Sequence, residues 1–293
     1  MASLKEVKGR IASVNNTRKI TSAMKMVASA KLHKAQAAIE SMLPYERRLH
    51  HILTDFMSNC TEVTSPFIVK REVKKVAVVV FASNTSLCGG FNANVIRHLV
   101  DLLAEYKPLG LENILVFPVG KKVADAVRKL GFRIEGDFQH MADKPSYQEA
   151  ADLAADLMKR FLHGDVDKVE LLYNHFKSTA SQILTRETYL PIDLNNEKKE
   201  EERTIDYILE PSAEELMQEM LPKVLRMKMF TVLLDSNAAE HAARTMAMQI
   251  ATDNANELLQ ELTVMYNKSR QQSITNELLD IVGGSKIAYR LLQ

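Results

Sequence analysis

The sequence is short of the residues that small disulfide-bonded folds and zinc sites need. It holds two cysteines, ten glycines, eight prolines and no tryptophan in 293 residues. Cys60 and Cys88 are too few for a disulfide framework or a four-ligand zinc site, so we expect reduced, buried and inert thiols. The remaining composition favours a helix-rich soluble protein.

Strong net charge and long apolar runs are also missing. The formal net charge is +1 at pH 7, which gives no overall footprint for nucleic acid. No stretch of about 18 uncharged apolar residues exists, so no segment is expected to span a membrane. The first twenty residues lack an apolar core of signal-peptide length.

Glycine and proline are unevenly placed and divide the chain. Seven glycines lie from Gly89 to Gly164, none lies between Gly164 and Gly283, and no proline follows Pro222. This distribution predicts an N-terminal coiled-coil helix over 1–57, an α/β globular domain over 73–193, a variable charged connection over 194–211, and a C-terminal coiled-coil helix over 212–293.

The first part carries a narrow apolar stripe at helical spacing. The stripe is formed by Leu4, Val7, Ile11, Val14, Ile20, Met24, Val27, Ala28, Leu32, Ala35 and Ile39. A stripe this narrow is typical of a coiled-coil seam rather than a broad core face. Pro44 is expected to kink this helix or end its first segment. A single helix of this length needs a partner to bury its stripe.

The middle part alternates between strand and helix patterns. Strands are predicted at Lys75–Phe81, Asn113–Val119, Val169–Tyr173 and Ile183–Leu190, with helices at Asn94–Tyr106, Lys121–Leu130 and Ser146–His163. Such alternation predicts a mostly parallel sheet in layers with helices. The last two strands are joined without a helix, so one edge of the sheet is expected to be antiparallel.

The last part is predicted to be one very long helix. Pro222 should bend or restart it, but nothing breaks it from Lys223 to Val282. About 60 residues at about 1.5 Å each span roughly 90 Å, which predicts a coiled-coil arm. Its natural partner is the first part. The predicted fold class is therefore α/β: a long antiparallel coiled coil of the N- and C-terminal helices with an inserted Rossmann-like domain.

No constellation of catalytic, metal-ligating or cofactor-binding residues is found. Gly89-Gly90 follows a strand pattern, but Phe91-Asn92 comes next, where a P-loop has Gly-Lys-Ser/Thr. A dinucleotide fingerprint needs three spaced glycines. The pair is therefore interpreted as a tight turn, and the scattered histidines show no ligand spacing.

Basic residues gather in the first part, at Lys5, Lys8, Arg10, Arg18, Lys19, Lys25, Lys31 and Lys34. They are compatible with a DNA-binding arm, with an ordinary solvated helix face, or with a stalk inside an acidic sleeve. The cluster has no interleaved aromatic residues, so nucleic acid is not expected as a partner.

Three segments of the chain resemble motifs of one known family. The segment from Ile11 to Gln36, "IASVNNTRKITSAMKMVASAKLHKAQ", is similar to the N-terminal helix of the gamma subunit of F-type ATP synthase. Ala243 to Ile287 is similar to its C-terminal helix and includes the hallmark Ile-Thr-x-Glu-x-x-Asp at Ile274 to Asp280. "SLCGGFN", from Ser86, resembles its first strand and turn. Ser285 stands where the family usually has alanine.

The resemblance implies a rotor with no active site of its own. Its shaft would stand inside a hexamer of three alpha and three beta subunits, and its foot would meet epsilon and the membrane c-ring. It implies proton-driven ATP synthesis, or the reverse hydrolysis, in a complex peripheral to the cytoplasmic face of the bacterial plasma membrane. The cysteine pair of the redox-controlled chloroplast form is not matched, so no thiol regulation is expected.

The resemblance also carries over contact residues. Met24, Arg244, Arg270, Gln271, Thr275 and Glu277 match positions that meet the beta subunits, and Tyr207 and Glu210 match the foot that faces epsilon and the c-ring. Without the resemblance, these would be interpreted as ordinary solvated or seam residues. A substitution Met24→Lys is expected to weaken coupling by adding an ion pair to a beta carboxylate.

Two other functions stay open from the residues alone. The chain could be a freestanding coiled-coil scaffold with the α/β domain as a docking head, or, less favoured, a nucleotide-binding enzyme. Co-purification with alpha and beta subunits distinguishes a rotor from a scaffold.

Overall fold

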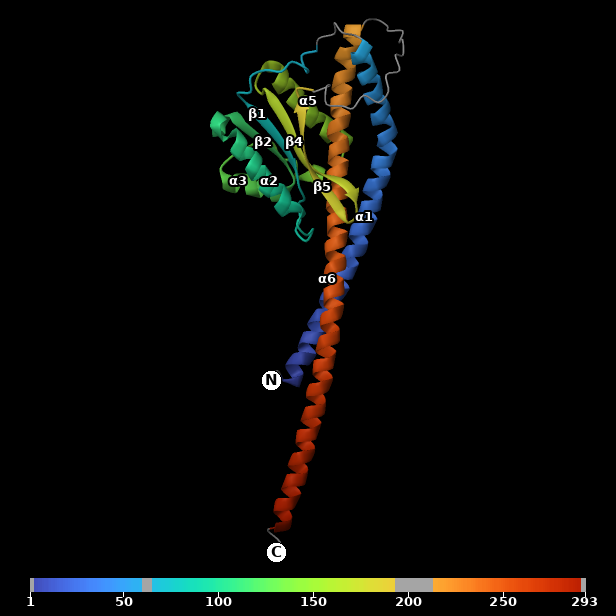
Figure 1. Cartoon of the computed structure of the whole chain (residues 1–293), viewed down its shortest axis with the longest axis vertical. Helices are drawn as coiled ribbons and strands as arrows, with labels where there is room; N and C mark the ends of the chain where they lie inside the picture. The colour runs from blue at the N-terminus through green and yellow to red at the C-terminus, as the bar shows by residue number, and fades with distance from the viewer. Residues whose placement is uncertain (1–2, 60–64, 193–212, 291–293) are drawn as a thin grey trace. The chain divides into compact units, whose positions relative to one another are not determined.

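The computed structural model describes residues 3–59, 65–192 and 213–290. They form two compact units: unit one holds 1–27 with 247–293, and unit two holds 28–246. The mixed α/β fold with long terminal helices and a mostly parallel sheet is confirmed (Figure 1). Residues 194–211, the predicted charged connection, lie outside the described residues, as does Cys60.

Unit two contains a five-stranded sheet in the order β3-β2-β1-β4-β5. Its strands are β1 (Val76–Phe81), β2 (Ile114–Val119), β3 (Arg133–Ile134), β4 (Lys168–Ser178) and β5 (Ser181–Leu190). β1 pairs in parallel with β2 and β4, whereas β4 and β5 are antiparallel. The predicted antiparallel edge is confirmed. All six residues of β1 are buried, which explains its uninterrupted apolar run.

Helices cover both faces of this sheet (Figure 1). One face packs against α2 (Phe91–Tyr106) and α3 (Lys121–Leu130), through the buried cluster of Leu99, Leu103 and Val123. The other packs against α4 (Gln139–Asp143), α5 (Tyr147–His163) and the first part of α6, through Phe117, Leu157 and Leu225. Two short 3-10 turns, Lys107–Leu109 and Leu111–Asn113, connect α2 to β2.

The two long helices are α1 (Leu4–Asn59) and α6 (Ala213–Arg290). Both contain a proline: Pro44 lies inside α1 and Pro222 inside α6. Of the outcomes expected at these prolines, an end at Pro44 and a restart at Pro222 are wrong. A proline removes one helix hydrogen bond, and side chains packed into the core nearby, such as Leu221 and Leu225, offset that loss.

In unit one, α1 and α6 run antiparallel and meet along a seam. The Thr21 and Thr252 hydroxyls lie 2.8 Å apart, and Arg18 Nη1 donates to Asn256 Oδ1 at 3.3 Å. Seam positions recur at intervals of three and four, the heptad pattern of a coiled coil. On α1 they are Val7, Ile11, Val14, Arg18, Thr21 and Lys25; on α6 they are Met248, Thr252, Ala255, Leu259, Leu262 and Tyr266.

This seam corrects the predicted stripe in its middle. Ile20 and Val27 were expected to face the partner helix, but 60% and 59% of their surfaces are exposed. Arg18 and Thr21 lie on the seam instead. A polar seam position weakens the pairing of the two helices and specifies its register. The apolar side chains of Ile20 and Val27 are left exposed on the outer face of α1.

A buried carboxylate fastens β4 to its neighbours in unit two. Glu170 is 2% exposed and lies 2.6 Å from Lys168 Nζ. It accepts hydrogen bonds from Arg186 Nε at 3.0 Å and Tyr106 Oη at 2.9 Å. Burial alone would raise the pKa of Glu170, but these bonds outweigh it and hold the pKa below its usual value.

We predict that the two seam threonines depend on each other. Thr21→Val or Thr252→Val alone should destabilise pairing in unit one by about 1 kcal/mol, because the remaining hydroxyl loses its partner across the seam and keeps only a carbonyl of its own helix. The double variant should recover or exceed wild-type stability, since two apolar groups then meet. Hydrogen exchange of the 248–262 amides in the full chain measures this, and additive losses would contradict the pairing.

We also predict that Glu170→Gln loosens the β4–β5 pair by about 1–3 kcal/mol, measured as faster amide exchange there. Because the folded-state pKa of Glu170 is depressed, its contribution is complete above the unfolded-chain pKa and is lost as the pH falls through the folded value. The gap to wild type should therefore narrow below about pH 4. The control Glu72→Gln removes the exposed Lys74 pair and should change little. A gap that widens in acid would contradict the argument.

Candidate functional site

The outer face of α1 in unit one carries an exposed apolar stripe. We call Ile20, Met24 and Val27 the α1 stripe; these positions share one helix face because they are four and three residues apart. Met24 is half-buried, whereas Ile20 and Val27 are mainly exposed. Met24 therefore lies between the seam and the outer face of α1. Its flexible thioether can adapt to varied neighbours.

The C-terminal stretch of α6 carries the predicted polar contact residues. Arg270, Gln271, Thr275 and Glu277 are all exposed. Thr275 Oγ1 donates to the Gln271 carbonyl at 2.9 Å. Within the described part of the chain, the guanidinium of Arg270 and the carboxylate of Glu277 have no side-chain partner, so both are available for charge-assisted hydrogen bonds.

The same stretch lies past the start of α1. The Thr21–Thr252 contact and antiparallel register place Leu4 near residues 269–270. Figure 1 shows α6 continuing beyond this point, and residues 274–282 are all exposed. Ile274, Leu278 and Ile281 lie among the polar side chains, with exposed fractions of 48%, 57% and 68%. This face combines apolar area with charge, a combination suited to a protein partner.

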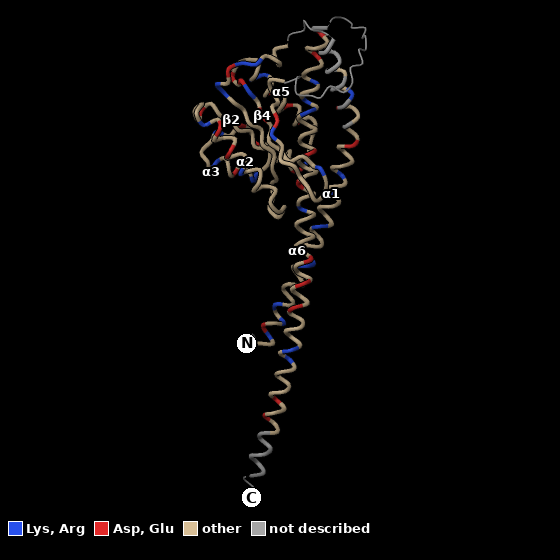
Figure 2. The backbone as a smooth tube through the Cα atoms, viewed as in Figure 1, with Lys and Arg blue, Asp and Glu red and all other residues tan. Residues whose placement is uncertain are grey.

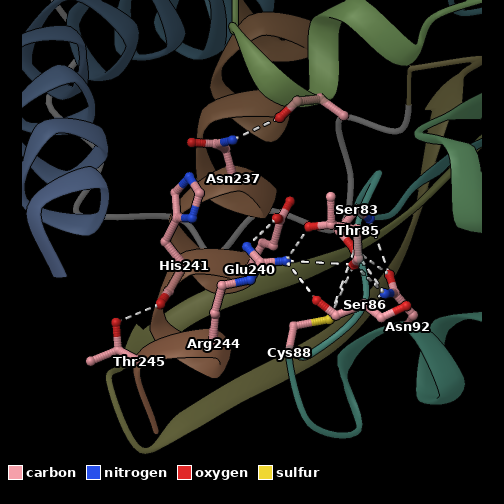
Figure 3. A network of polar contacts seen from close by, with 11 residues as sticks. Ser83, Thr85, Ser86, Cys88, Asn92, Asn237, Glu240, His241, Arg244 and Thr245 are labelled. Atoms are coloured by element: carbon pink, nitrogen blue, oxygen red, sulfur yellow. Dashed lines mark hydrogen bonds and ion pairs between the residues drawn. The ribbon is translucent and has the colours of Figure 1, made fainter. Parts of the chain in front are cut away.

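Arg244 differs from the other predicted contact residues because its guanidinium is used inside unit two. Its Nη1 lies 2.6 Å from Glu240 Oε1, and its Nη2 donates to Thr85 Oγ1 at 2.9 Å (Figure 3). Only 11% of the Arg244 side chain and 9% of the Glu240 side chain are exposed. Arg244 thus joins α6 to the loop between β1 and α2.

That loop, residues 82–90, is itself held by polar contacts. Ser83 Oγ donates to the Thr85 carbonyl at 2.6 Å, and the Ser83 amide donates to Asn92 Oδ1 at 3.1 Å. Asn84 links the loop to α4 and α3, through the Gln139 carbonyl and the Lys121 amide. Cys88 is 2% exposed, so the prediction that this thiol is buried is confirmed.

The environment of Glu240 and His241 favours their neutral forms. Burial raises the pKa of Glu240, and the nearby Arg244 offsets only part of this effect. Burial, together with the positive charges of Arg244 and Lys31, lowers the pKa of His241 to about 4. His241 is therefore neutral at pH 7, and within the described residues its Nδ1 has no hydrogen-bond partner.

The place where a nucleotide binds in many related sheets is filled here. Ligands bind open α/β sheets outside the carboxyl ends of strands where the connections change direction, which in this sheet is between β1 and β4. At the end of β1, Asn237 and Glu240 of α6 lie beside Ala82, and Asp235 of α6 accepts from the Phe176 amide of β4. The cavity that these α6 residues share with Ala82 and Val119, on the β2 side of β1, is about 10 Å³. This is room for one water molecule at most, far below a cofactor pocket of about 300 Å³ or more.

The glycine pair acts in the turn that precedes α2. Gly89 has a φ of 59°, a left-handed conformation that favours glycine, and Gly90 is the N-cap residue of α2. The Phe91 amide donates to the Cys88 carbonyl and closes the turn. The interpretation of this pair as a tight turn is confirmed.

Charged groups of both signs are interspersed along α6 (Figure 2). Across residues 3–59, 65–192 and 213–290, no three His, Cys, Asp or Glu side chains come together to hold a metal ion. Over the same ranges, no helix is long and apolar enough to cross a membrane.

The structure does not gather the predicted contact residues into one cluster. Met24 and the Arg270–Glu277 stretch belong to unit one, whereas Arg244 belongs to unit two. Tyr207 and Glu210 lie outside the described residues. Sequence reasoning missed the partners of Arg244. The spacing of Glu240 and Arg244, four residues apart in a helix, could have indicated their pairing, but no local signal points to Thr85.

Comparison with known proteins identifies relatives along nearly the whole chain. The family model described as ATP synthase matches residues 3–287. The ATP synthase gamma chain of Phocaeicola vulgatus is 82% identical and that of Bacteroides thetaiotaomicron 63% identical; each alignment covers 97% of this chain and 99% of the relative.

Solved structures share the fold at lower identity. The rotor of the Euglena gracilis mitochondrial ATP synthase aligns with a TM-score of 0.60 at 20% identity, over 92% of this chain and 98% of that one. A chain of the same enzyme's OSCP/F1/c-ring structure aligns with a TM-score of 0.61 at 21% identity, over 97% and 93%. With a family model that spans almost all of the sequence and relatives this similar, the chain belongs to the family of ATP synthase gamma chains.

Proposed function

We propose that the chain is the central rotor shaft of a rotary ATP synthase. It transmits torque between the proton-driven membrane c-ring and the catalytic alpha/beta hexamer and has no active site of its own. The observation that carries this proposal is α6, a 78-residue helix paired with α1 through a heptad seam in unit one. A long uninterrupted helix resists twisting because its hydrogen bonds and packing repeat without a break.

Two exposed surfaces of unit one support contact with the beta subunits in this proposal. The α1 stripe and the Arg270–Glu277 stretch face the beta subunits, where apolar contact and charge-assisted hydrogen bonds form and break with rotation. Tyr207 and Glu210 face epsilon and the c-ring in this proposal. The expected boundaries at 57, 73, 193 and 212 separate shaft, globular domain and connection.

The proposed location follows from those partners. The complex lies at the cytoplasmic face of the bacterial plasma membrane, and this chain is attached peripherally through its partners.

A rotor predicts a fixed subunit ratio. Purified through a tag on this chain from its native membranes, the complex should contain one copy of the chain for three alpha and three beta subunits, since one asymmetric shaft serves three catalytic sites. Native mass spectrometry of the detergent-solubilised complex gives the ratio. A chain that purifies alone, or in equal numbers with one other protein, supports the freestanding scaffold instead.

The α1 stripe gives a sharper prediction about coupling. Met24→Lys should lower the protons pumped per ATP hydrolysed at least about twofold, because a new ion pair at a beta carboxylate binds one angular position too tightly. Quenching of a pH-sensitive dye in inverted vesicles, divided by the hydrolysis rate, gives this ratio.

Met26→Lys is the matched control for that experiment. Met26 is 66% exposed and lies about 200° around the helix from Met24, on a different face. The same new charge there should leave the ratio unchanged. Equal effects at both positions would show that charge on α1, rather than the stripe, is responsible.

A further inference from the structure

Arg244 joins α6 to the β1–α2 loop and adds to polar contacts that hold α6 to β4 and β5. The Phe176 amide of β4 donates to Asp235 Oδ1 at 2.8 Å, and Tyr189 Oη of β5 donates to the Leu225 carbonyl at 2.8 Å. At the loop, the neighbouring contacts are apolar. Cys88 and Phe91 from the loop and α2 pack against Ala239 of α6. Small apolar contacts resist separation, but they are non-directional and oppose sliding or rotation of the helix only weakly. Directional bonds are needed to fix the helix angle.

Arg244 supplies those bonds in a geometry that is already organised. One nitrogen of the guanidinium is fixed by Glu240 on the preceding turn of α6, at 2.6 Å. The other nitrogen donates to Thr85 Oγ1 at 2.9 Å and is aimed out of the helix toward the loop (Figure 3). The planar fork of arginine allows both bonds at once, which lysine cannot reproduce.

Short hydrogen bonds hold the β1–α2 loop that accepts the bond from Arg244. The Thr85 carbonyl is bonded to Ser83 Oγ, and Ser83 follows the end of β1. Asn92 Nδ2 donates to Ser83 Oγ at 2.7 Å and ties the same loop to α2. A force on Thr85 therefore reaches the central strand of the sheet through short polar contacts rather than through a loose segment.

We propose that Arg244, fixed by Glu240 and bonded to Thr85, is a positioning residue that locks the rotation of α6 at the β1–α2 loop, beside the bonds that α6 makes to β4 and β5. We call these three residues the α6 clamp. The inference rests on the proposed rotor function and adds one step to it: part of the torque passes between the sheet and α6 through the α6 clamp. Arg244 then acts inside its own chain, not on a beta subunit.

The experiment replaces the Thr85 hydroxyl in the complete membrane-bound complex. Thr85→Val removes the shortest acceptor and keeps the shape, and it leaves the Thr85 and Ser86 carbonyls, each 3.5 Å from Arg244 Nη2. Thr85→Ser keeps the hydroxyl and serves as the conservative variant. Arg244→Lys keeps the positive charge beside Glu240 but loses the fork. The readout is protons pumped per ATP hydrolysed in inverted vesicles, with subunit ratios checked by gel.

The α6 clamp predicts a specific pattern. Thr85→Val and Arg244→Lys should each lower the pumping-to-hydrolysis ratio at least about twofold, because each removes the same charge-assisted bond. Thr85→Ser should keep the wild-type ratio. The double variant Thr85→Val with Arg244→Lys should be no worse than the stronger single variant, since both act on one contact.

Other outcomes separate the alternatives. A reduced ratio in Arg244→Lys with a normal ratio in Thr85→Val overturns the clamp, which is defined by the bond to the Thr85 hydroxyl. Additive losses also overturn it, and so does a Thr85→Ser variant as impaired as Thr85→Val. If Thr85→Val fails to assemble while Thr85→Ser assembles, hydrogen exchange of the 240–246 amides in the full chain decides: unchanged protection overturns the clamp.

The wild-type complex distinguishes failure of the clamp from failure of the proposed function. Wild-type vesicles that pump protons while Thr85→Val behaves normally contradict the clamp alone. A wild-type complex that contains this chain but shows no ATP-driven pumping contradicts the rotor function on which the clamp rests. The exposed Lys223–Glu219 pair gives a further control, because Lys223→Gln removes an ion pair of α6 without touching the loop.

Discussion

The structure depends on the mutual burial of two helices that could not stand alone. An isolated helix of this length gains little stability in water, because most helical stability in proteins comes from packing of one face. In unit one that face is a seam with polar members, including the Thr21–Thr252 contact. In unit two, the small residues Ala35, Ala238 and Ala242 allow α1 and α6 to approach closely around Leu32. Polar contacts and close packing of alanines thus stabilise the two long helices, although the seam between them buries little apolar area.

The sheet of unit two packs against this helix at the place where related sheets bind a ligand. Its order resembles that of nucleotide-binding sheets, yet α6 lies across the carboxyl end of β1, where the ligand would bind. The loop that cradles phosphate in such proteins here holds Arg244. The same topology and the same turn position here bind helix α6 of the chain itself. Fold alone therefore does not establish function.

Most of the fold could be predicted from the sequence because its signals are local. Buried strands such as Val76–Phe81 are continuous apolar runs, and the absence of glycine between Gly164 and Gly283 is consistent with the long helix α6. The effect of the two prolines was harder to predict, because packing of the flanking turns decides whether a helix continues past a proline that removes one hydrogen bond. β4 extends to Ser178, beyond the predicted end, because its polar last residues pair with β5 in a way that only the hairpin register determines.

The seam shows where periodicity reaches its limit. Ile20 and Val27 are apolar and suitably spaced, so they fit a seam as well as Arg18 and Thr21 do, yet they lie outside. When a helix has apolar residues on two faces, its sequence pattern does not determine which face packs against the partner helix. The outer face, half exposed and apolar over the α1 stripe, needs a second surface to cover it, since exposed apolar patches are costly in water. A polar seam inside and an apolar stripe outside are the distribution expected of a helix pair that works within an enclosing protein ring.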